Sequence, residues 1–275
     1  MKTKNKFLIF GKGYLGQRLQ KELHCPISHQ RIHILEDIVK EIKKYNPQCV
    51  INCIGETGKR NVDDCELSID KTMEANAFIP ILFAEAAYRH KFKLIHISSG
   101  CIYHFEYGKT KPITEHAIPD YYDLYYSRTK IYAENVLDEM AKRRNILILR
   151  VRIPLDDRPN PKNIIDKLIR YKTVIDVPNS ITYIPDFIKA VKHLVKIDAR
   201  GIYNTVCKGG LRYSTLMKLY ARYVPGFQYK VIPLKDLKLV RTNLVLSTQK
   251  LEKTGFKVRR AYDALEECLK RYIKY

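Results

Sequence analysis

Short apolar runs alternate with longer segments of helical periodicity along the first half of the chain. Apolar runs at 7–10, 49–54, 93–98 and 146–153 have the length of strands, and a weaker one lies at 26–30. Between them, apolar residues recur at helical spacing in 15–24, 33–45, 65–90 and 122–143. Strands that are apolar throughout, each followed by a helix, predict a parallel sheet covered on both faces. We therefore expect a doubly wound α/β fold whose ligands bind at the carboxyl ends of the strands.

The regular alternation ends after Pro154. A charged loop with two prolines at 156–161 precedes helical segments at 163–171, 186–196, 214–223 and 262–275, with one strand at 201–206. We expect residues 1–154 to form a nucleotide-binding domain to which 179–205 returns. Residues 155–178 and 206–275 are predicted to form a smaller C-terminal lobe that binds the substrate.

The first apolar run leads directly into a G-x-G-x-x-G motif formed by Gly11, Gly13 and Gly16. In a strand–turn–helix context the first glycine permits the tight turn, and the second lets the backbone approach a pyrophosphate. The third lets the helix pack closely against the strand. The N–H groups of the following helix then face the phosphates. The motif predicts a Rossmann-type dinucleotide site, to which Tyr14 and Leu15 also contribute.

The residues after the second strand bear on the choice between NADH and NADPH. An acidic residue there would hold a ribose 2′-hydroxyl, but none lies between Glu22 and Glu36. Ser28 and Arg31 occupy this segment, and they can hydrogen-bond and pair with a 2′-phosphate. NADPH is therefore the predicted cofactor, although Arg31 could also be an ordinary surface charge. The remaining residues predicted to bind the cofactor are Asn52, Cys53, Gly55, Tyr126, Lys130 and Arg152.

Tyr126 and Lys130 are four residues apart in a helical segment, so both lie on one face of the helix. An ammonium group stabilises a neighbouring phenolate and lowers the phenol's pKa from its usual value of about 10. Such a tyrosine can donate a proton to the alkoxide formed when a hydride adds to a carbonyl. The spacing recurs by chance in a chain with 20 tyrosines. Its position after the fourth strand is what favours a catalytic role.

Two serines, Ser98 and Ser99, end the fourth strand. A hydroxyl at this point can hydrogen-bond a substrate carbonyl and polarise it. We assign that role to Ser99 and expect Ser98 to pack toward the cofactor. The alternative is a Ser-Ser-Gly turn without a chemical role.

Taken together, these residues resemble the extended short-chain dehydrogenase/reductase family. Within it they resemble the nucleotide-rhamnose synthases, which are 3,5-epimerase/4-reductases related to dTDP-4-dehydrorhamnose reductase. The similarity covers nearly the whole chain and rests on segments 7–16, 57–66, 100–103, 126–130, 149–154, 160–163 and 177–180. It implies an NADPH-dependent enzyme that converts a UDP- or dTDP-linked 4-keto-6-deoxy-D-glucose into the nucleotide-linked L-rhamnose.

The resemblance also implies roles for individual side chains. Cys101 and Lys167 would be the base and acid of epimerisation at C3 and C5, whose hydrogens are acidified by the C4 ketone. A thiolate beside a cation can remove such a proton, and a lysine can supply one. Reduction would come last because it removes that ketone. The candidate substrate ligands are Thr57, Asn61, Asn163 and Asn179. The plainer alternatives are a buried cysteine, a solvated lysine and asparagines that form turns.

Two partners follow from the same resemblance. A separate 4,6-dehydratase would supply the 4-keto sugar, and the protein would be a homodimer packed through the Tyr126 helix. Two alternatives stay open. A reductase without epimerase activity would need Ser99, Tyr126 and Lys130 but not Cys101 or Lys167. A non-catalytic NADP-binding regulatory subunit on the same fold would need none of them.

Charge and cysteine content narrow the remaining possibilities. The net charge is +21, yet no block of five basic residues occurs, so we do not expect nucleic-acid binding. A positive field would also attract substrates that carry phosphates. Seven cysteines without C-x-x-C spacing favour neither a disulfide framework nor a metal site. No segment has the length of a membrane span or the pattern of a signal peptide, so a cytoplasmic enzyme is expected.

Overall fold

The computed structural model describes residues 6–237 and 242–275. Their contacts form two units. The first runs through Ile102 and includes Tyr121–Leu149 and Asp198–Tyr203, and the second contains Tyr103–Asp120, Arg150–Ile197 and the chain from Asn204 onward. The division differs from the one predicted. Only 198–203 of the segment 179–205 joins the first unit, because its strand pairs at the sheet edge, and the segment 103–120 belongs to the second unit.

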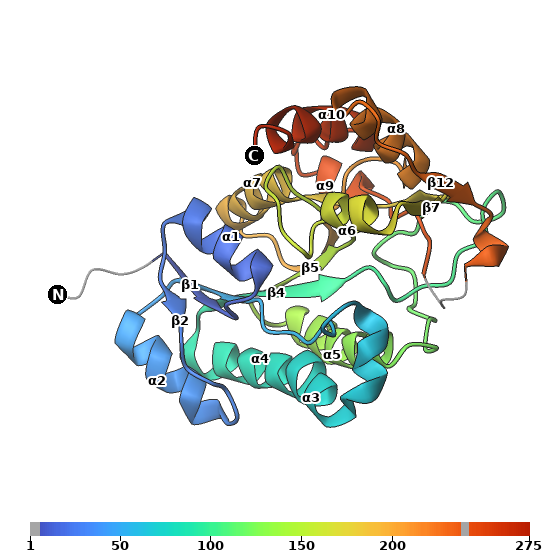
Figure 1. The fold of residues 1–275 in the computed structure, drawn as a ribbon. Helices are drawn as coiled ribbons and strands as arrows, with labels where there is room; N and C mark the ends of the chain where they lie inside the picture. The colour runs from blue at the N-terminus through green and yellow to red at the C-terminus, as the bar shows by residue number, and fades with distance from the viewer. Residues whose placement is uncertain (1–5, 238–241) are drawn as a thin grey trace. The chain divides into compact units, whose positions relative to one another are not determined.

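The first unit is built on a twisted sheet that has six strands among the described residues (Figure 1). Their order is β10-β5-β4-β3-β1-β2, and the pairs β2–β1, β1–β3 and β3–β4 are parallel. Chain connections diverge between β1 and β3, which is where ligands bind in doubly wound folds. The strands are β1 (Phe7–Phe10), β2 (Ile27–Ser28), β3 (Cys49–Asn52), β4 (Lys93–Ser99), β5 (Ile146–Val151) and β10 (Gly201–Asn204).

Helices of the first unit cover both faces of this sheet, as the fully apolar strands predict. Helix α1 (Tyr14–Leu23) lies on one face, and α2 (Leu35–Tyr45), α4 (Ile79–His90) and α5 (Tyr125–Ala141) lie on the other (Figure 1). Every residue of β1, β3 and β4 is buried. The predicted doubly wound α/β fold is confirmed.

The long helix predicted at 65–90 is interrupted. Residues Val62–Leu67 form a 3-10 turn, and Ser68, with φ −144° and ψ 58°, leaves the helical region. Helix α3 (Ile69–Met73) then passes through a π turn at Glu74–Phe78 into α4. A π turn inserts one residue into a helix and is frequent at functional sites. Apolar periodicity does not reveal it, because the helical pattern continues on both sides.

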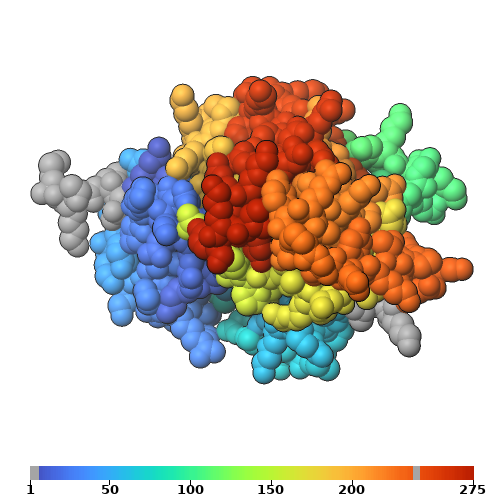
Figure 2. Space-filling model, turned by 45° about the horizontal axis from the view of Figure 1, so that its top comes forward, coloured from blue at the N-terminus to red at the C-terminus, as the bar shows by residue number. Residues whose placement is uncertain are grey.

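In its described residues, the second unit combines helices with three pairs of very short strands. The helices are α6 (Ile164–Tyr171), α7 (Ile184–Lys196), α8 (Tyr213–Tyr223), α9 (Gln249–Glu252) and α10 (Ala261–Tyr272), with a 3-10 turn at Leu234–Asp236. The strand pairs are β6 (Pro154–Leu155) with β9 (Thr182–Tyr183), β8 (Pro178–Asn179) with β11 (Leu211–Arg212), and β7 (Thr173–Ile175) with β12 (Lys230–Ile232). Helices α8 and α10 lie side by side (Figure 2). The helices predicted here are confirmed, whereas strands of two or three residues carry no periodicity that would predict them.

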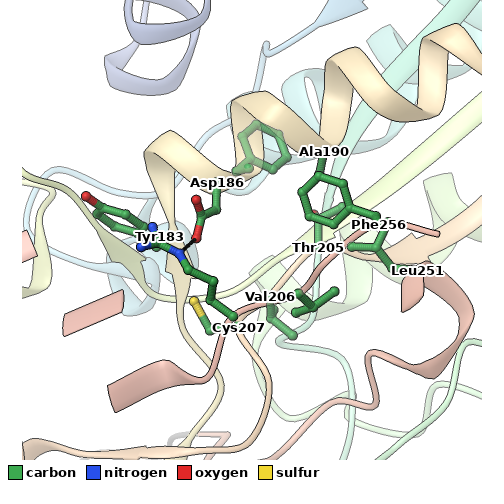
Figure 3. Close-up of a pocket in the computed structure, with 11 residues that line it drawn as sticks. Tyr183, Asp186, Ala190, Thr205, Val206, Cys207, Leu251 and Phe256 are labelled. Carbon is green, nitrogen blue, oxygen red and sulfur yellow. Dashed lines mark hydrogen bonds and ion pairs between the residues drawn. The ribbon is translucent and has the colours of Figure 1, made fainter. Parts of the chain in front are cut away.

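A small cavity of the second unit lies beside the first turn of α7 (Figure 3). Phe256, Leu251 and Val206 line its apolar part. Its charged groups are already paired, because Arg259 Nε donates to Asp186 Oδ2 at 2.6 Å and the guanidinium also pairs with Glu267. The cavity is therefore a packing feature that ties α7 to the C-terminal segment. Among the described residues, no helix is long and apolar enough to cross a membrane.

Candidate active site

The glycine loop after β1 has the shape that a pyrophosphate requires. Gly11 has φ +96°, and a Cβ on it would lie 2.6 Å from the carbonyl carbon of Cys53. A Cβ on Gly16 would lie 1.9 Å from the oxygen of Gly11. A Cβ on Gly13 would meet nothing within 4 Å, so the backbone there is open to an approaching group. The N-cap residue of α1 is Gly13, which has no side chain to cap the helix, and helix N-termini of this kind bind anions. The loop therefore fits the diphosphate of a dinucleotide.

The two predicted 2′-phosphate ligands differ in availability. Ser28 is buried, and its hydroxyl donates to Glu41 Oε2 at 2.6 Å while accepting from the N–H of Gln30. That hydroxyl has no proton left for a phosphate, so Ser28 shapes the loop instead. Arg31 is exposed. Lys12 is a second cation near this segment, and no motif had indicated it. Its Nζ lies 3.0 Å from Nδ1 of His29, which follows β2.

The chain after β3 joins the cofactor segment to the catalytic helix. A Cβ on Gly55 would lie 3.1 Å from Asn76 Oδ1 and 3.3 Å from Lys130 Nζ. Gly55 thus lets the lysine ammonium lie against the backbone. Asn76, in the π turn, accepts from the N–H of Glu56 at 2.9 Å and donates to its carbonyl at 3.0 Å. This asparagine fixes the segment beside Lys130, and only the tertiary structure reveals it.

Asn52 and Cys53, both predicted to bind the cofactor, lie at the carboxyl end of β3, which ends at Asn52 rather than Ile54. Asn52 is fully buried, and its Oδ1 accepts from the N–H of Ile54 at 2.9 Å. Its Nδ2 lies 3.4 Å from Nδ1 of His96, the residue opposite it on β4. Burial raises the pKa of the Cys53 thiol to about 12, so the thiol is neutral. Both residues shape the floor of the site through their backbone and their packing.

Hydrogen bonds through Cys101 join the end of β4 to the start of α5, and the four residues assigned to catalysis in the first unit lie on these two elements or directly after β4. Ser99 Oγ accepts from the N–H of Cys101 at 3.0 Å, which leaves its hydroxyl proton free for a substrate oxygen. The carbonyl of Cys101 accepts from Ser127 Oγ at 2.6 Å, next to Tyr126 on α5. Lys130 Nζ lies 6.0 Å from the centroid of the Tyr126 ring. The backbone of Cys101 therefore connects Ser99, at the end of β4, to the helix that carries Tyr126 and Lys130.

Lys130 is 4% exposed, and burial lowers the pKa of its ammonium to about 8. A buried cation without a direct ion pair is costly, and such perturbed groups concentrate in active sites. A lysine of this kind can stabilise a phenolate while charged.

Ser98 does not face the cofactor, contrary to the prediction. Successive residues of a strand point to opposite faces, and Ser98 points toward α5. Its Oγ donates to Glu134 Oε2 at 2.7 Å, and both side chains are buried. Glu134 is thus a buried acid next to the catalytic pair that the sequence analysis missed.

The segment from 57 to 66 reaches the start of the catalytic helix. Glu66 Oε1 accepts from the N–H of Tyr125, the first residue of α5, at 2.6 Å. A carboxylate at this end stabilises the helix through its dipole. Asn61 Oδ1 accepts from the N–H of Asp63 and caps the 3-10 turn, while Thr57 is exposed. Asn61 therefore has a structural role whether or not it also binds a substrate.

The other predicted site residues lie in the second unit. Asn163 is fully buried, and its side chain caps α6 and bonds to the backbone of Asp156 and Arg158. These internal bonds occupy the amide, so a direct contact of Asn163 with substrate is not supported. Lys167, on α6, is half-buried.

Arg152 and Asn179 contact each other, although they were assigned to cofactor and substrate respectively. Arg152 Nη2 donates to Asn179 Oδ1 at 2.8 Å, and Nη1 donates to Thr242 Oγ1 at 2.7 Å. Asn179 Nδ2 donates to Asn243 Oδ1 at 2.8 Å. Arg152 thus belongs to a polar cluster of the second unit, and Thr242 and Asn243 are members that no motif indicated.

Comparison with known proteins decides the family. The model of the RmlD substrate binding domain matches residues 5–177. The chain belongs to this family. An Arabidopsis thaliana bifunctional dTDP-4-dehydrorhamnose 3,5-epimerase/dTDP-4-dehydrorhamnose reductase is 32% identical to this RmlD-family chain over 268 residues. That match covers 91% of the chain and 87% of the relative.

A second relative is longer than the RmlD-family chain. A trifunctional UDP-glucose 4,6-dehydratase/UDP-4-keto-6-deoxy-D-glucose 3,5-epimerase/UDP-4-keto-L-rhamnose-reductase of Arabidopsis thaliana is 29% identical. The match covers the whole chain but only 42% of the relative.

Solved structures confirm the fold of this RmlD-family chain. The crystal structure of a UDP-rhamnose synthase from Acanthamoeba polyphaga mimivirus matches with a TM-score of 0.90, 23% identity and coverage of 98% and 100% of the two chains. A dTDP-4-dehydrorhamnose reductase of Bacillus anthracis, solved in complex with NADP, matches with a TM-score of 0.82, 21% identity and coverage of 99% of each chain. The fold is thus one that binds NADP in a structural neighbour.

Proposed function

We propose that the chain is an NADPH-dependent 3,5-epimerase/4-reductase that converts UDP- or dTDP-linked 4-keto-6-deoxy-D-glucose into the nucleotide-linked L-rhamnose. The observation that carries the proposal is the set of contacts that links Ser99, at the carboxyl end of β4, through the Cys101 backbone to the helix where Lys130 faces Tyr126. The activities of the two Arabidopsis thaliana relatives support it.

Residues around the glycine loop would hold the cofactor. The backbone from Gly11 to Gly16 and the start of α1 would bind the diphosphate, and Arg31 with Lys12 would pair with the 2′-phosphate. When bound, NADPH supplies the hydride for reduction at C4. Lys130, which lies against Gly55, would bind the nicotinamide ribose as well as act on Tyr126.

Reduction at C4 needs a proton donor and a group that polarises the ketone. Ser99 would donate a hydrogen bond to the C4 oxygen, and Tyr126 would transfer its proton to the same oxygen as negative charge develops. The ammonium of Lys130 stabilises the phenolate that remains. Tyr126→Phe should therefore abolish reduction.

Epimerisation needs a base and an acid for C3 and C5. We assign the base to Cys101, whose backbone is fixed by Ser99 on one side and by Ser127 on the other. The acid is assigned to Lys167 of α6. Ser99 and Tyr126 would stabilise the enolate oxygen during proton exchange, because that oxygen is the same C4 oxygen that is later reduced. Asn61, Asn179 and Thr57 are proposed to contact the nucleotide-sugar.

The deciding experiment is incubation of the protein with NADPH and each of the two 4-keto-6-deoxyglucose nucleotides, with products identified by mass and NMR. Nucleotide-linked L-rhamnose is the expected product. If NADPH is oxidised but the product keeps its C3 and C5 configuration, the protein is a reductase without epimerase activity. An absence of NADPH oxidation with both substrates would contradict the proposal and favour a regulatory subunit.

A second experiment separates the two reactions. Cys101→Ser should stop solvent deuterium from entering C3 and C5, because a serine hydroxyl is a far weaker base than a thiolate. The variant should still reduce a substrate that is already epimerised. Serine is close to cysteine in size, so the fold is expected to remain intact. Deuterium uptake at the wild-type rate would contradict the role of Cys101.

Two partners complete the proposal. A 4,6-dehydratase would supply the 4-keto sugar as a separate reaction. A second copy of the chain would cover the exposed apolar side chains Tyr132 and Val136 on α5 and the nearby Phe78, which is 59% exposed. Val136→Glu would place a charge in that interface. Light scattering should show a dimer for the wild type and a monomer for the variant. A monomeric wild-type protein would contradict the proposed dimer.

A further inference from the structure

Three ionisable side chains form one stripe along α5. Tyr126, Lys130 and Glu134 are each four residues from the next, so they share one face of the helix. They are 7%, 4% and 2% exposed. A glutamate is almost never buried to this degree unless it is paired or hydrogen-bonded. The reduction described above uses the first two residues and assigns nothing to Glu134.

Ser98 fixes the carboxylate of Glu134. Its hydroxyl donates to Oε2 at 2.7 Å from the face of β4 that α5 covers. Hydrogen bonds from a hydroxyl to a carboxylate are short and strong, so this bond holds the side chain in place. The result is a buried carboxylate held in a fixed position one helical turn from Lys130.

In the described part of the chain, the buried ammonium of Lys130 lacks a counter-charge in direct contact, which this carboxylate can supply from one turn away. Among the described residues its ammonium has no ion-pair partner within 4.0 Å, although burial lowers its pKa to about 8. The titratable groups that face it from the surrounding elements are Tyr126 and Glu134 of α5, Cys65 of the 3-10 turn, Cys53 after β3 and His96 of β4.

Most of these neighbours carry no charge. Burial raises the pKa of Cys53 to about 12 and that of Cys65 to about 11, so both thiols are neutral near pH 7. Burial, aided by the nearby Lys130, lowers the pKa of His96 well below its ordinary value, so the imidazole is neutral as well. Glu134 is therefore the group of this set that can balance the ammonium.

We propose that Glu134, held by Ser98, is a positioning residue that keeps the ammonium of Lys130 charged beside Tyr126. The inference rests on the proposed reductase function. Attraction between opposite charges is strong where water is excluded, so one helical turn is close enough for Glu134 to act. Without the carboxylate, Lys130 would lose its proton at a lower pH and would no longer stabilise the phenolate of Tyr126.

Glu134→Gln tests the proposal directly, because the amide keeps the shape and an acceptor for Ser98 while removing the charge. The pKa of Lys130 is measured by NMR of isotope-labelled lysine in the protein without substrate, and its resonance is assigned from its absence in Lys130→Met. The pKa should fall by about one unit in Glu134→Gln. Asp138→Asn removes an identical charge one turn farther along α5 and should leave the Lys130 pKa unchanged. An unchanged value in Glu134→Gln would overturn the proposal.

Kinetics provide a second readout. The alkaline limb of kcat/KM should move to lower pH by about one unit in Glu134→Gln, because Lys130 and Tyr126 both lose protons more readily without a neighbouring anion. Glu134→Asp should return most of that shift. If Glu134→Gln does not fold, Glu134→Asp and Glu134→Asn replace the comparison, because they differ only in charge. The alkaline limb should lie at lower pH in the Asn variant than in the Asp variant. A slower enzyme with an unmoved limb would mean a packing role and would overturn the proposal. The NMR titration needs no turnover, so failure of the reductase function would show separately as an absence of NADPH oxidation.

Discussion

Two buried lysines of the first unit lie near opposite ends of the central sheet and have different surroundings. Lys93, at the start of β4, is 5% exposed, and its Nζ donates to Asn145 Oδ1 at 2.6 Å, Asp198 Oδ1 at 2.9 Å and the carbonyl of Ala199 at 2.7 Å. Lys130, near the carboxyl ends of the strands, is 4% exposed and has no carboxylate within ion-pair distance among the described residues.

The difference separates a structural lysine from a chemical one. Both side chains lose hydration on folding, but only Lys93 regains a full set of acceptors. The desolvation of Lys130 stays partly uncompensated and appears as a pKa lowered to about 8. Natural proteins tolerate such a cost mainly where the strained group is used. The contrast supports a catalytic Lys130 independently of the Y-x-x-x-K spacing.

Removing the amine of Lys130 should have the largest effect. In Lys130→Met the phenolate of Tyr126 loses its cation, so NADPH oxidation with a 4-keto sugar nucleotide should slow by roughly 10²–10⁴-fold. Because burial of the ammonium has a net cost even with its attraction to Glu134, the thermal unfolding midpoint should not fall. A variant with wild-type turnover would contradict the distinction between the two lysines, and a variant that unfolds would show that Lys130 is structural.

Local spacing explains how much of this site the sequence could predict. Gly11, Gly16, Tyr126 and Lys130 belong to short motifs whose function follows from their separation along one turn or one helix. Ser98 was misplaced because its partner Glu134 is 36 residues away, and only the packing of α5 on β4 joins them. Asn76 and the contact between Arg152 and Asn179 depend in the same way on tertiary structure, which no periodicity encodes.

The pH dependence of the unfolding free energy should reveal the lowered pKa of Lys130. The pKa of Lys130 is about 8 in the folded protein against an ordinary value of 10.5, so the unfolded chain binds more protons between these values. The free energy of unfolding contributed by Lys130 therefore rises with pH, by about 3 kcal/mol in all. The free energy of unfolding in urea is measured for wild type and Lys130→Met between pH 7 and 10.5. The difference between the two proteins at each pH gives the contribution of Lys130. Reductase activity should fall over the same range as the ammonium is lost. A difference that stays constant with pH would contradict the lowered pKa.

Lys93→Met should reverse the pattern of the first prediction. Its loss leaves the carbonyl of Ala199 and the amide oxygen of Asn145 without their donor, which should cost about 1–3 kcal/mol of unfolding free energy. Turnover at a temperature where the variant is folded should match that of the wild type. The exposed Lys43 offers a control, since Lys43→Met should change stability by less than about 0.5 kcal/mol. Loss of turnover without loss of stability would mean that Lys93 also serves the reaction.

Gly55→Ala should produce the smallest effect and the most local one. The added Cβ would lie 3.1 Å from Asn76 Oδ1 and 3.3 Å from Lys130 Nζ, so one of them must move by a few tenths of an ångström. Such a displacement of the ammonium should lower kcat by up to about tenfold and cost less than about 1.5 kcal/mol of stability. Gly13→Ala is the matched control, because its Cβ meets no protein atom within 4 Å. It should leave stability and kcat unchanged and raise only the KM for NADPH, since the new methyl group would obstruct the pyrophosphate. If Gly55→Ala leaves kcat as unchanged as Gly13→Ala does, Lys130 tolerates displacement. The expectation that catalysis depends on the position of the ammonium would then be wrong.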